Sequence, residues 1–279
     1  MFTNDMALKR ARAIERVKKY IEEDGGTTLL ATGIAGDDSR IAKAAYDAGA
    51  RLFEPNHPAV VLARGYKGIT NMHDAELVRH EIKMDQMLEV TRGVRNVVGT
   101  ESFITVGFPG GFTELKPINL CEEDFRRLSD AGADSIHCHK SSLEDLEELI
   151  SMAHKYGLLV DCYIGRNTDK HIFGVPAETD EEIIEAIHNL EDIGADFIGM
   201  MTGMSYEGIE AGRIHPEVER RVKVLVENAT APTLAEGGIN LDNFQAFKDL
   251  GVNILVVGTS IDNIVQEGTK ETVKKFLGK

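Results

Sequence analysis

The sequence predicts an α/β fold in which eight parallel strands close into a single (β/α)8 barrel, the TIM-barrel fold. One observation is a repeat: a Gly, a small or apolar residue, a polar residue and the start of a short apolar run recur at 49–53, 132–136, 194–198 and 251–255. Such a Gly can adopt the left-handed conformation that ends a helix before the next strand. The second observation is that short apolar runs alternate with amphipathic segments along the chain, which is typical of a parallel sheet.

The individual elements follow from hydrophobic periodicity. We expect strands at 28–33, 52–54, 103–107, 135–139, 158–164, 197–201, 233–236 and 254–258. Apolar residues at helical spacing predict helices at 39–48, 122–131, 143–156, 180–193, 216–228, 241–250 and 271–277. An open, doubly wound sheet is the alternative architecture. The barrel is favoured because no G-x-G-x-x-G motif follows the first strand and because the units are evenly spaced.

We expect one domain over residues 1–279, since no low-complexity tract or linker of Pro, Gly and Ser divides the chain. An extra amphipathic helix at 5–23 precedes the first strand and should cap the bottom of the barrel. The connection after strand two, 55–101, is unusually long and should contain a helix near 73–94.

Charge and hydropathy exclude several classes of protein. The chain has 31 Lys and Arg against 46 Asp and Glu, a net charge of −15, so an extended basic surface for nucleic acid is not expected. No apolar run approaches the roughly 20 residues that span a membrane, and the first residues do not resemble a signal peptide. With three cysteines in no metal-finger spacing, these features predict a cytoplasmic protein with no membrane partner.

Glycines follow the last two predicted strands, at the end of the barrel where active sites lie. Gly237 and Gly238 come after strand seven, and Gly258, Thr259 and Ser260 come after strand eight. Glycine lets the backbone approach an anion, and a following helix directs its free N–H groups toward it. We therefore expect a small phosphorylated metabolite as the partner, held without a local excess of Lys or Arg.

Glu236, His139 and Asp161 are the candidate catalytic residues, because each stands at the carboxyl end of a predicted strand. His137 and His139 alternate along strand four and share one face. No cofactor is required by the sequence, but a divalent metal is possible. The two histidines are weak candidates for its ligands, with Asp161 or Glu54 as the third.

Five further residues near strand ends are candidates for substrate binding. These are Arg166, Lys140, Glu54, Asn56 and Thr202. The two basic side chains could pair with an anionic group, and the others offer hydrogen bonds.

The closing segment resembles the ribulose-phosphate-binding barrel superfamily. Ala-Glu-Gly-Gly-Ile at 235–239, followed by Val-Val-Gly-Thr-Ser-Ile at 256–261, is most similar to the N-acylmannosamine-6-phosphate 2-epimerases, and 194–199 is similar as well. This resemblance implies a phosphate at the glycine loops and an acid/base role for Glu236. Gly238 replaces the epimerases' Arg, and their catalytic lysine has no counterpart in 103–109. Of the two aspartates of the histidine-biosynthesis isomerases, Asp161 could match one.

Together these features predict a phosphosugar or sugar-derived phosphate isomerase or epimerase that transfers a proton next to a carbonyl. Glu236 and either His139 or Asp161 would form the acid/base pair. One alternative is an aldolase or decarboxylase acting on a phosphorylated keto compound, with Lys140 or Lys67 as the amine. Another is a non-catalytic barrel that binds a phosphometabolite. A homo-oligomer is possible, since barrels of the resembled superfamily are often oligomeric.

Overall fold

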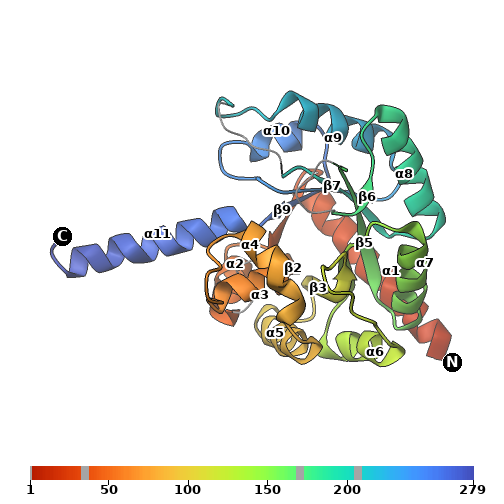
Figure 1. The fold of residues 1–279 in the computed structure, drawn as a ribbon, viewed down its shortest axis with the longest axis horizontal. Coiled ribbons are helices and arrows are strands. Elements are labelled where there is room, and N and C mark those ends of the chain that lie inside the picture. Colours follow the sequence, from red (N-terminus) through yellow and green to blue (C-terminus); the bar gives the residue numbers. More distant parts are fainter. Residues whose placement is uncertain (1, 33–37, 168–172, 204–208) are drawn as a thin grey trace.

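The computed structural model describes residues 2–32, 38–167, 173–203 and 209–279, and it contains the expected barrel (Figure 1). Eight strands form a closed parallel ring: β1 (Thr28–Thr32), β2 (Leu52–Glu54), β3 (Phe103–Phe112), β4 (Ser135–His139), β5 (Leu159–Gly165), β7 (Phe197–Met201), β8 (Thr233–Glu236) and β9 (Ile254–Val257). The ring closes where β9 pairs with β1, Leu29 standing opposite Leu255. A short strand, β6 (Val175–Pro176), pairs with β5 outside the ring. The predicted fold class is therefore confirmed.

Helices surround the ring (Figure 1). They are α2 (Ser39–Asp47), α3 (His57–Ala63), α4 (Met72–Val78), α5 (Met84–Val98), α6 (Glu122–Ala131), α7 (Leu143–Lys155), α8 (Asp180–Asp192), α9 (Pro216–Asn228) and α10 (Phe244–Asp249). Their boundaries follow local signals: α8 begins at a capping box formed by Thr179 and Glu182, and α6 ends at Gly132 with a φ of 100°. The connection between β2 and β3 holds α3, α4 and α5.

The extra helix α1 (Phe2–Glu23) lies across the amino-terminal ends of the strands. Ala13 and Val17 pack against side chains that fill the barrel interior. Arg16 pairs with Asp134 at 2.8 Å and Arg10 pairs with an aspartate just before β7. Because α1 covers this end, access to the interior is left at the carboxyl ends of the strands.

The predicted end of the third strand is wrong. The strand was expected to stop at Gly107, but β3 continues to Phe112 with a register shift, so that Gly107 pairs with His137 and Phe112 with His139. Phe108 and Phe112 are both buried. Their burial keeps the chain in the sheet through a glycine-rich segment, and the extra residues form a bulge.

Two predicted helices also differ. The single helix expected near 73–94 is divided, because buried Ile82 is extended between a 3-10 turn (Arg79–Glu81) and α5. The helix expected at 271–277 is only the end of α11 (Thr259–Phe276), which starts directly after β9 and projects away from the barrel (Figure 1). The predicted last residue of strand one, Gly33, lies outside the described residues. Within the described ranges, no helix is long and apolar enough to cross a membrane.

Candidate functional site

The barrel interior changes from apolar to polar along its axis. At the α1 end it is filled by side chains such as Leu52, Phe103 and Leu159. At the opposite end, alternation along the strands turns polar side chains inward. The residues that gather there are Glu54 of β2, His137 and His139 of β4, Asp161 and Tyr163 of β5, and Glu236 of β8. The three predicted catalytic residues, Glu236, His139 and Asp161, are thus brought together with His137 and Glu54.

His137 is the centre of this cluster. Its Nδ1 lies 2.6 Å from Asp161 Oδ2. Its Nε2 lies 3.4 Å from Glu236 Oε2 and 3.5 Å from Glu54 Oε1. His139 Nε2 lies 3.4 Å from the same Glu236 oxygen. The Glu236 side chain is 16% exposed, whereas the other four are almost fully buried, so Glu236 is the group that faces the opening.

Two carboxylates are fixed by hydroxyl and amide donors. Asp161 Oδ1 accepts a hydrogen bond from the Thr105 hydroxyl at 2.7 Å. Glu54 Oε1 accepts one from Asn56 Nδ2 at 2.6 Å and one from the Thr32 hydroxyl at 3.1 Å. Asn56, a predicted substrate-binding residue, therefore orients Glu54 and also caps α3 through its side-chain oxygen.

Aromatic rings complete the walls. The Phe112 ring stacks on His139 with centroids 4.4 Å apart, and the Tyr163 ring lies 4.7 Å from His139 and 5.0 Å from His137. Tyr163 fits because Gly199 stands opposite: a Cβ there would lie 2.2 Å from the tyrosine ring. Tyr163 was not predicted from the sequence. Side chains alternate along a strand, so its position two residues after Asp161 was the signal that places it on the same face.

The side chains of this cluster have pKa values shifted in opposite directions from their ordinary values. Burial disfavours a charged His137, but Glu54, Glu236 and Asp161 together raise its pKa to about 10. Burial and the charge of His137 lower the pKa of His139 to about 4. Burial raises the pKa of Glu54 to about 8, whereas for Glu236 the positive charge of His137 outweighs burial and lowers the pKa to about 2. Carboxyl groups with such different proton affinities around one site are typical of acid/base chemistry.

Three of these side chains also fit a divalent metal ion. Among the described residues, His137 Nε2, His139 Nε2 and Glu236 Oε2 have no hydrogen-bond partner. One possible ligand atom from each of these side chains lies within 4.8 Å of the other two. Metal bonds of about 2.1 Å in tetrahedral geometry separate donor atoms by about 3.4 Å, close to the distances found here. Asp161 holds the other ring nitrogen of His137, as carboxylates do for metal-binding histidines. Glu236, rather than the expected Asp161 or Glu54, completes the set.

The glycine loops lie beside Glu236. Gly237 and Gly238 have φ values of 106° and 72°, which glycine adopts readily. The Thr202 hydroxyl donates toward the carbonyl oxygens of Glu236 and Gly237, at 2.9 Å and 2.7 Å, so the predicted Thr202 shapes this loop. Gly258 precedes α11, with Thr259 and Ser260 in its first turn. Because β8 and β9 are neighbours, the two loops adjoin each other.

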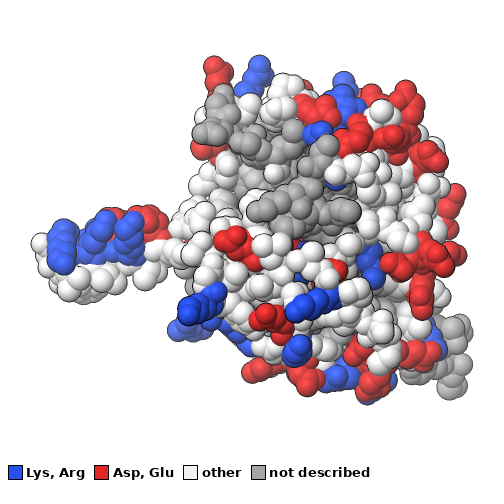
Figure 2. All heavy atoms as spheres, viewed as in Figure 1, with Lys and Arg blue, Asp and Glu red and all other residues white. Residues whose placement is uncertain are grey.

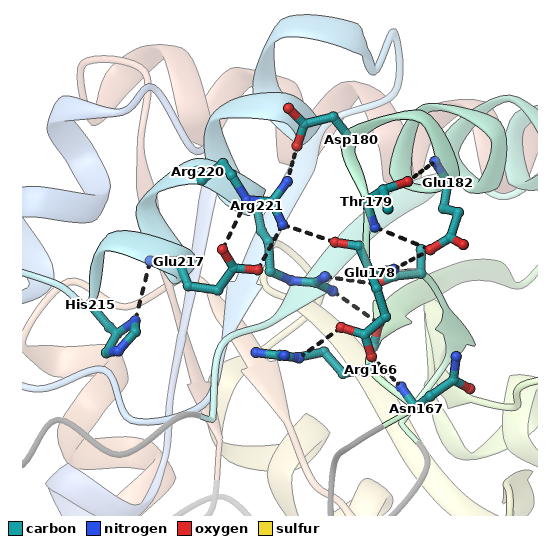
Figure 3. Close-up of polar contacts among 12 residues, drawn as sticks. Arg166, Asn167, Glu178, Thr179, Asp180, Glu182, His215, Glu217, Arg220 and Arg221 are labelled. Carbon is teal, nitrogen blue, oxygen red and sulfur yellow. Dashed lines mark hydrogen bonds and ion pairs between the residues drawn. The ribbon is translucent and has the colours of Figure 1, made fainter.

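The two basic candidates lie at the rim. Lys140 directly follows β4 and is half-buried. Arg166 follows β5, and its Nε donates to Glu178 Oε2 at 3.1 Å (Figure 3). In the same view, buried Arg221 donates to the backbone oxygens of Gly165 and Ala177, which ties together the two ends of the β5–α8 connection.

Comparison with known proteins supports the resemblance noted in the sequence. No family model matches the chain. A segment of 138 residues is 30% identical to ribulose-phosphate 3-epimerase of Schizosaccharomyces pombe, covering 48% of this chain and 52% of that protein. The match thus spans about half the length of this curated relative.

Solved structures show the same fold. The tryptophan synthase alpha-subunit of Pyrococcus furiosus superposes with a TM-score of 0.61 at 17% identity, covering 91% of this chain and 98% of that one. The alpha-subunit from Legionella pneumophila gives a TM-score of 0.60 at 17% identity, covering 92% and 91%. These two structures share the barrel fold, and the 138-residue segment shared with the epimerase is what supports the resemblance to the ribulose-phosphate-binding barrel superfamily. A 2,3-dimethylmalate lyase of the PEP mutase/isocitrate lyase superfamily has a TM-score of 0.61 at 13% identity, covering 94% and 86%. These relatives carry enzyme names. At identities of 13–17%, the solved structures show only that the fold is shared.

Proposed function

We propose that this chain is an epimerase or isomerase that moves a proton next to the carbonyl group of a small phosphorylated sugar. One observation carries the proposal: His137, His139, Glu236 and Glu54 converge at the open end of the barrel, directly beside the two glycine loops. The epimerase named among the relatives supports the same class of reaction.

Glu236 is the proposed base. It is the most exposed carboxylate of the cluster, and the positive charge held beside it, from His137 or from a metal ion in place of that proton, keeps it ionised and able to accept a proton. Glu54 is the proposed acid, because its raised pKa keeps a proton on the carboxyl group at neutral pH. The two belong to strands separated in the ring by β1 and β9. One group can therefore remove a proton and the other can return one, which inverts a carbon centre.

His137 and His139 would hold a divalent metal ion together with Glu236, and the ion would displace the proton of His137. Such an ion would polarise a carbonyl oxygen and stabilise the negative charge that develops on it. Asp161 serves as a positioning residue, since its hydrogen bond fixes the ring of His137. In this arrangement His139 and Asp161, which the sequence put forward as proton-transfer partners of Glu236, hold and orient the site instead.

The phosphate group of the substrate is assigned to the glycine loops. The loop at Gly237 and Gly238 and the start of α11 at Gly258, Thr259 and Ser260 offer backbone N–H groups, and a helix N-terminus favours a negative charge. Lys140 and Arg166 follow β4 and β5, on the other side of the ring from β9, so the backbone of the glycine loops is the main partner of the phosphate. This mode of binding is compatible with a net charge of −15, because no extended basic surface is needed.

The test is solvent-proton exchange. The protein is incubated in D2O with ribulose 5-phosphate and a panel of other ketose phosphates, and deuterium at the carbon next to the carbonyl is followed by NMR. We expect Glu236→Gln to slow the exchange by at least ~100-fold. Glu227→Gln, on the exposed face of α9, is the matched control and should leave the rate unchanged.

Other outcomes would reject the proposal. Exchange that survives Glu236→Gln would exclude Glu236 as the base. Covalent trapping of a substrate by borohydride would instead favour the lyase reading through a lysine amine. A chain that is stabilised by phosphate esters but exchanges no proton across the panel would be a non-catalytic binding barrel.

A further inference from the structure

One part of the barrel wall lacks the cover that the rest has. The outward-facing residues Phe53, Ile104 and Val160, on β2, β3 and β5, are 0% exposed. Leu29 faces outward on β1 and is 39% exposed. Since the outer surface of such a barrel is normally covered by a helix after each strand, the exposed wall at Leu29 of β1 is the place for the helix that follows the neighbouring β9.

A groove of about 440 Å³ opens beside Leu29, and the β9 side chains in its floor, Leu255 and Val257, are 3% and 8% exposed. Its apolar lining comes from the two strands, from α10 and the loop before it, and from the first turns of α11: Leu29, Leu241, Phe244, Leu255, Val257 and Ile264. Leu241 is 72% exposed. An exposed apolar surface of this kind on a barrel wall indicates a docking site.

The helix that should fill the groove has an apolar face of its own. None of the residues of α11, all of which the structure describes, is buried. Ile261, Ile264, Val265, Val273 and Phe276 recur at helical spacing, and Phe276 is 88% exposed. The charged side chains are paired with one another elsewhere on the helix, Lys270 with Glu267 and Lys274 with Glu271. Figure 2 shows charged atoms along one edge of the projecting helix and uncharged atoms along the other.

The far end of α11 cannot cover the wall of its own barrel. The helix is continuous from Thr259 to Phe276, so its end lies about 25 Å from its beginning and points away from the molecule (Figure 1). Only its first turns, at Ile261 and Ile264, reach the groove. The chain therefore carries both an open groove and an apolar helix of the kind that would fill one.

We propose that α11 is exchanged between two copies of this chain, so that the helix of each copy fills the groove on the β1–β9 wall of the other. The exchange is reciprocal, as two-fold symmetry requires. The two α11 helices run antiparallel, which places Phe276 of one copy near Ile261 and Ile264 of the other. This inference concerns the wall of the barrel and stands apart from the proposed function.

The size of the contact reaches the lower limit of about 1,000 Å² expected for a specific interface. A helix of 18 residues is about 27 Å long and about 10 Å wide, so two exchanged helices bury on the order of 1,000 Å² in total. The exchange also places the first turn of α11 between two subunits. This turn contains Thr259 and Ser260 of the proposed phosphate site.

The oligomeric state of the full chain tests this inference. We expect light scattering coupled to size-exclusion chromatography to give the mass of a dimer at micromolar concentration. Phe276→Glu should raise the dimer dissociation constant by at least ~100-fold, because each dimer contains the substitution twice. Asn263→Asp adds the same charge on the side of the helix that carries Lys270 and Lys274, and it should leave the dimer intact.

A second variant tests the groove independently of any change in α11. Leu29→Glu changes the groove, and it should also give a monomer with an unchanged circular-dichroism spectrum. A monomeric native chain would overturn the proposal, whether α11 remains exposed or folds back onto its own barrel. A native dimer that both substitutions leave intact would overturn it as well, since its interface would lie elsewhere.

Discussion

At the scale of single residues, the open end of the barrel holds side chains that would be costly to bury separately. A buried imidazole contacts three carboxylates at His137, and hydroxyl and amide donors fix two of these carboxylates. Networks of this kind are stable when each member has a partner. The atoms of His139 and Glu236 that lack a hydrogen-bond partner among the described residues are therefore the ones to expect in contact with a ligand.

Asp161→Asn tests the positioning role of this carboxylate. The substitution weakens the hold on His137 Nδ1 without changing any proposed metal ligand. We expect the affinity for Zn²⁺, measured by competition with a coloured chelator, to fall by ~10–100-fold. Asp192→Asn, an exposed change on α8, is the control. Equal affinities in the two variants would contradict the role of Asp161.

Gly199→Ala tests the packing of Tyr163. The new Cβ would lie 2.2 Å from the tyrosine ring, which has no free space in the barrel interior. We expect the free energy of unfolding, measured with urea, to fall by about 1–3 kcal/mol. Gly268→Ala meets nothing within 4 Å in the middle of α11 and should raise stability by about 0.5–1 kcal/mol. If both substitutions were equally tolerated, Gly199 would not be making room for Tyr163.

At the scale of elements, the helices are fixed to the bottom of the barrel through carboxylates that precede the strands. Asp134, just before β4, accepts hydrogen bonds from Arg16 of α1 at 2.8 Å, from Arg95 of α5 at 2.5 Å and from the Ile104 backbone N–H at 2.9 Å. One residue thus joins two helices to two strands. The sequence placed α1 at this end of the barrel but could not identify its partners.

Asp134→Asn should therefore destabilise the fold. The amide retains the shape of the side chain but leaves two partly buried arginines without a countercharge. We expect a loss of about 2–4 kcal/mol in the free energy of unfolding. Asp130→Asn removes an exposed ion pair with Arg126 and should cost at most about 1 kcal/mol. Similar losses of stability in both variants would show that Asp134 does not stabilise the contact of α1 and α5 with the strands.

At the scale of the whole molecule, the sequence predicted the ring of strands because period-two and period-3.6 patterns are local properties. It predicted His137, His139, Glu54 and Glu236 at one end, since the carboxyl ends of parallel strands meet there. It missed the extension of β3 to Phe112, which depends on distant side chains that bury Phe108 and Phe112. It also missed the length of α11, because Gly268 interrupts the helical pattern without ending the helix.

Stability of the whole fold should depend on pH through His57. Burial lowers the pKa of His57 to about 4 in the folded state, against an ordinary value of 6.5. Between these values the unfolded chain binds more protons, so stability decreases as the pH falls from about 6.5 to 4. Between pH 6.5 and 4, the free energy of unfolding should fall by about 3 kcal/mol more for the native chain than for His57→Asn. Denaturation with urea at each pH measures both values. Equal slopes would show that His57 is not held neutral.

A metal ion held by His137, His139 and Glu236 is proposed to assist proton transfer on a phosphorylated sugar. Deuterium exchange next to the carbonyl of ribulose 5-phosphate, followed by NMR before and after treatment with a chelator, tests this role of the metal. We predict that chelation abolishes the exchange, that a divalent metal restores it in the native chain, and that His139→Asn is not restored while the exposed His188→Asn is. Exchange that persists fully in the metal-free chain, or that His139→Asn leaves unchanged, would contradict the claim.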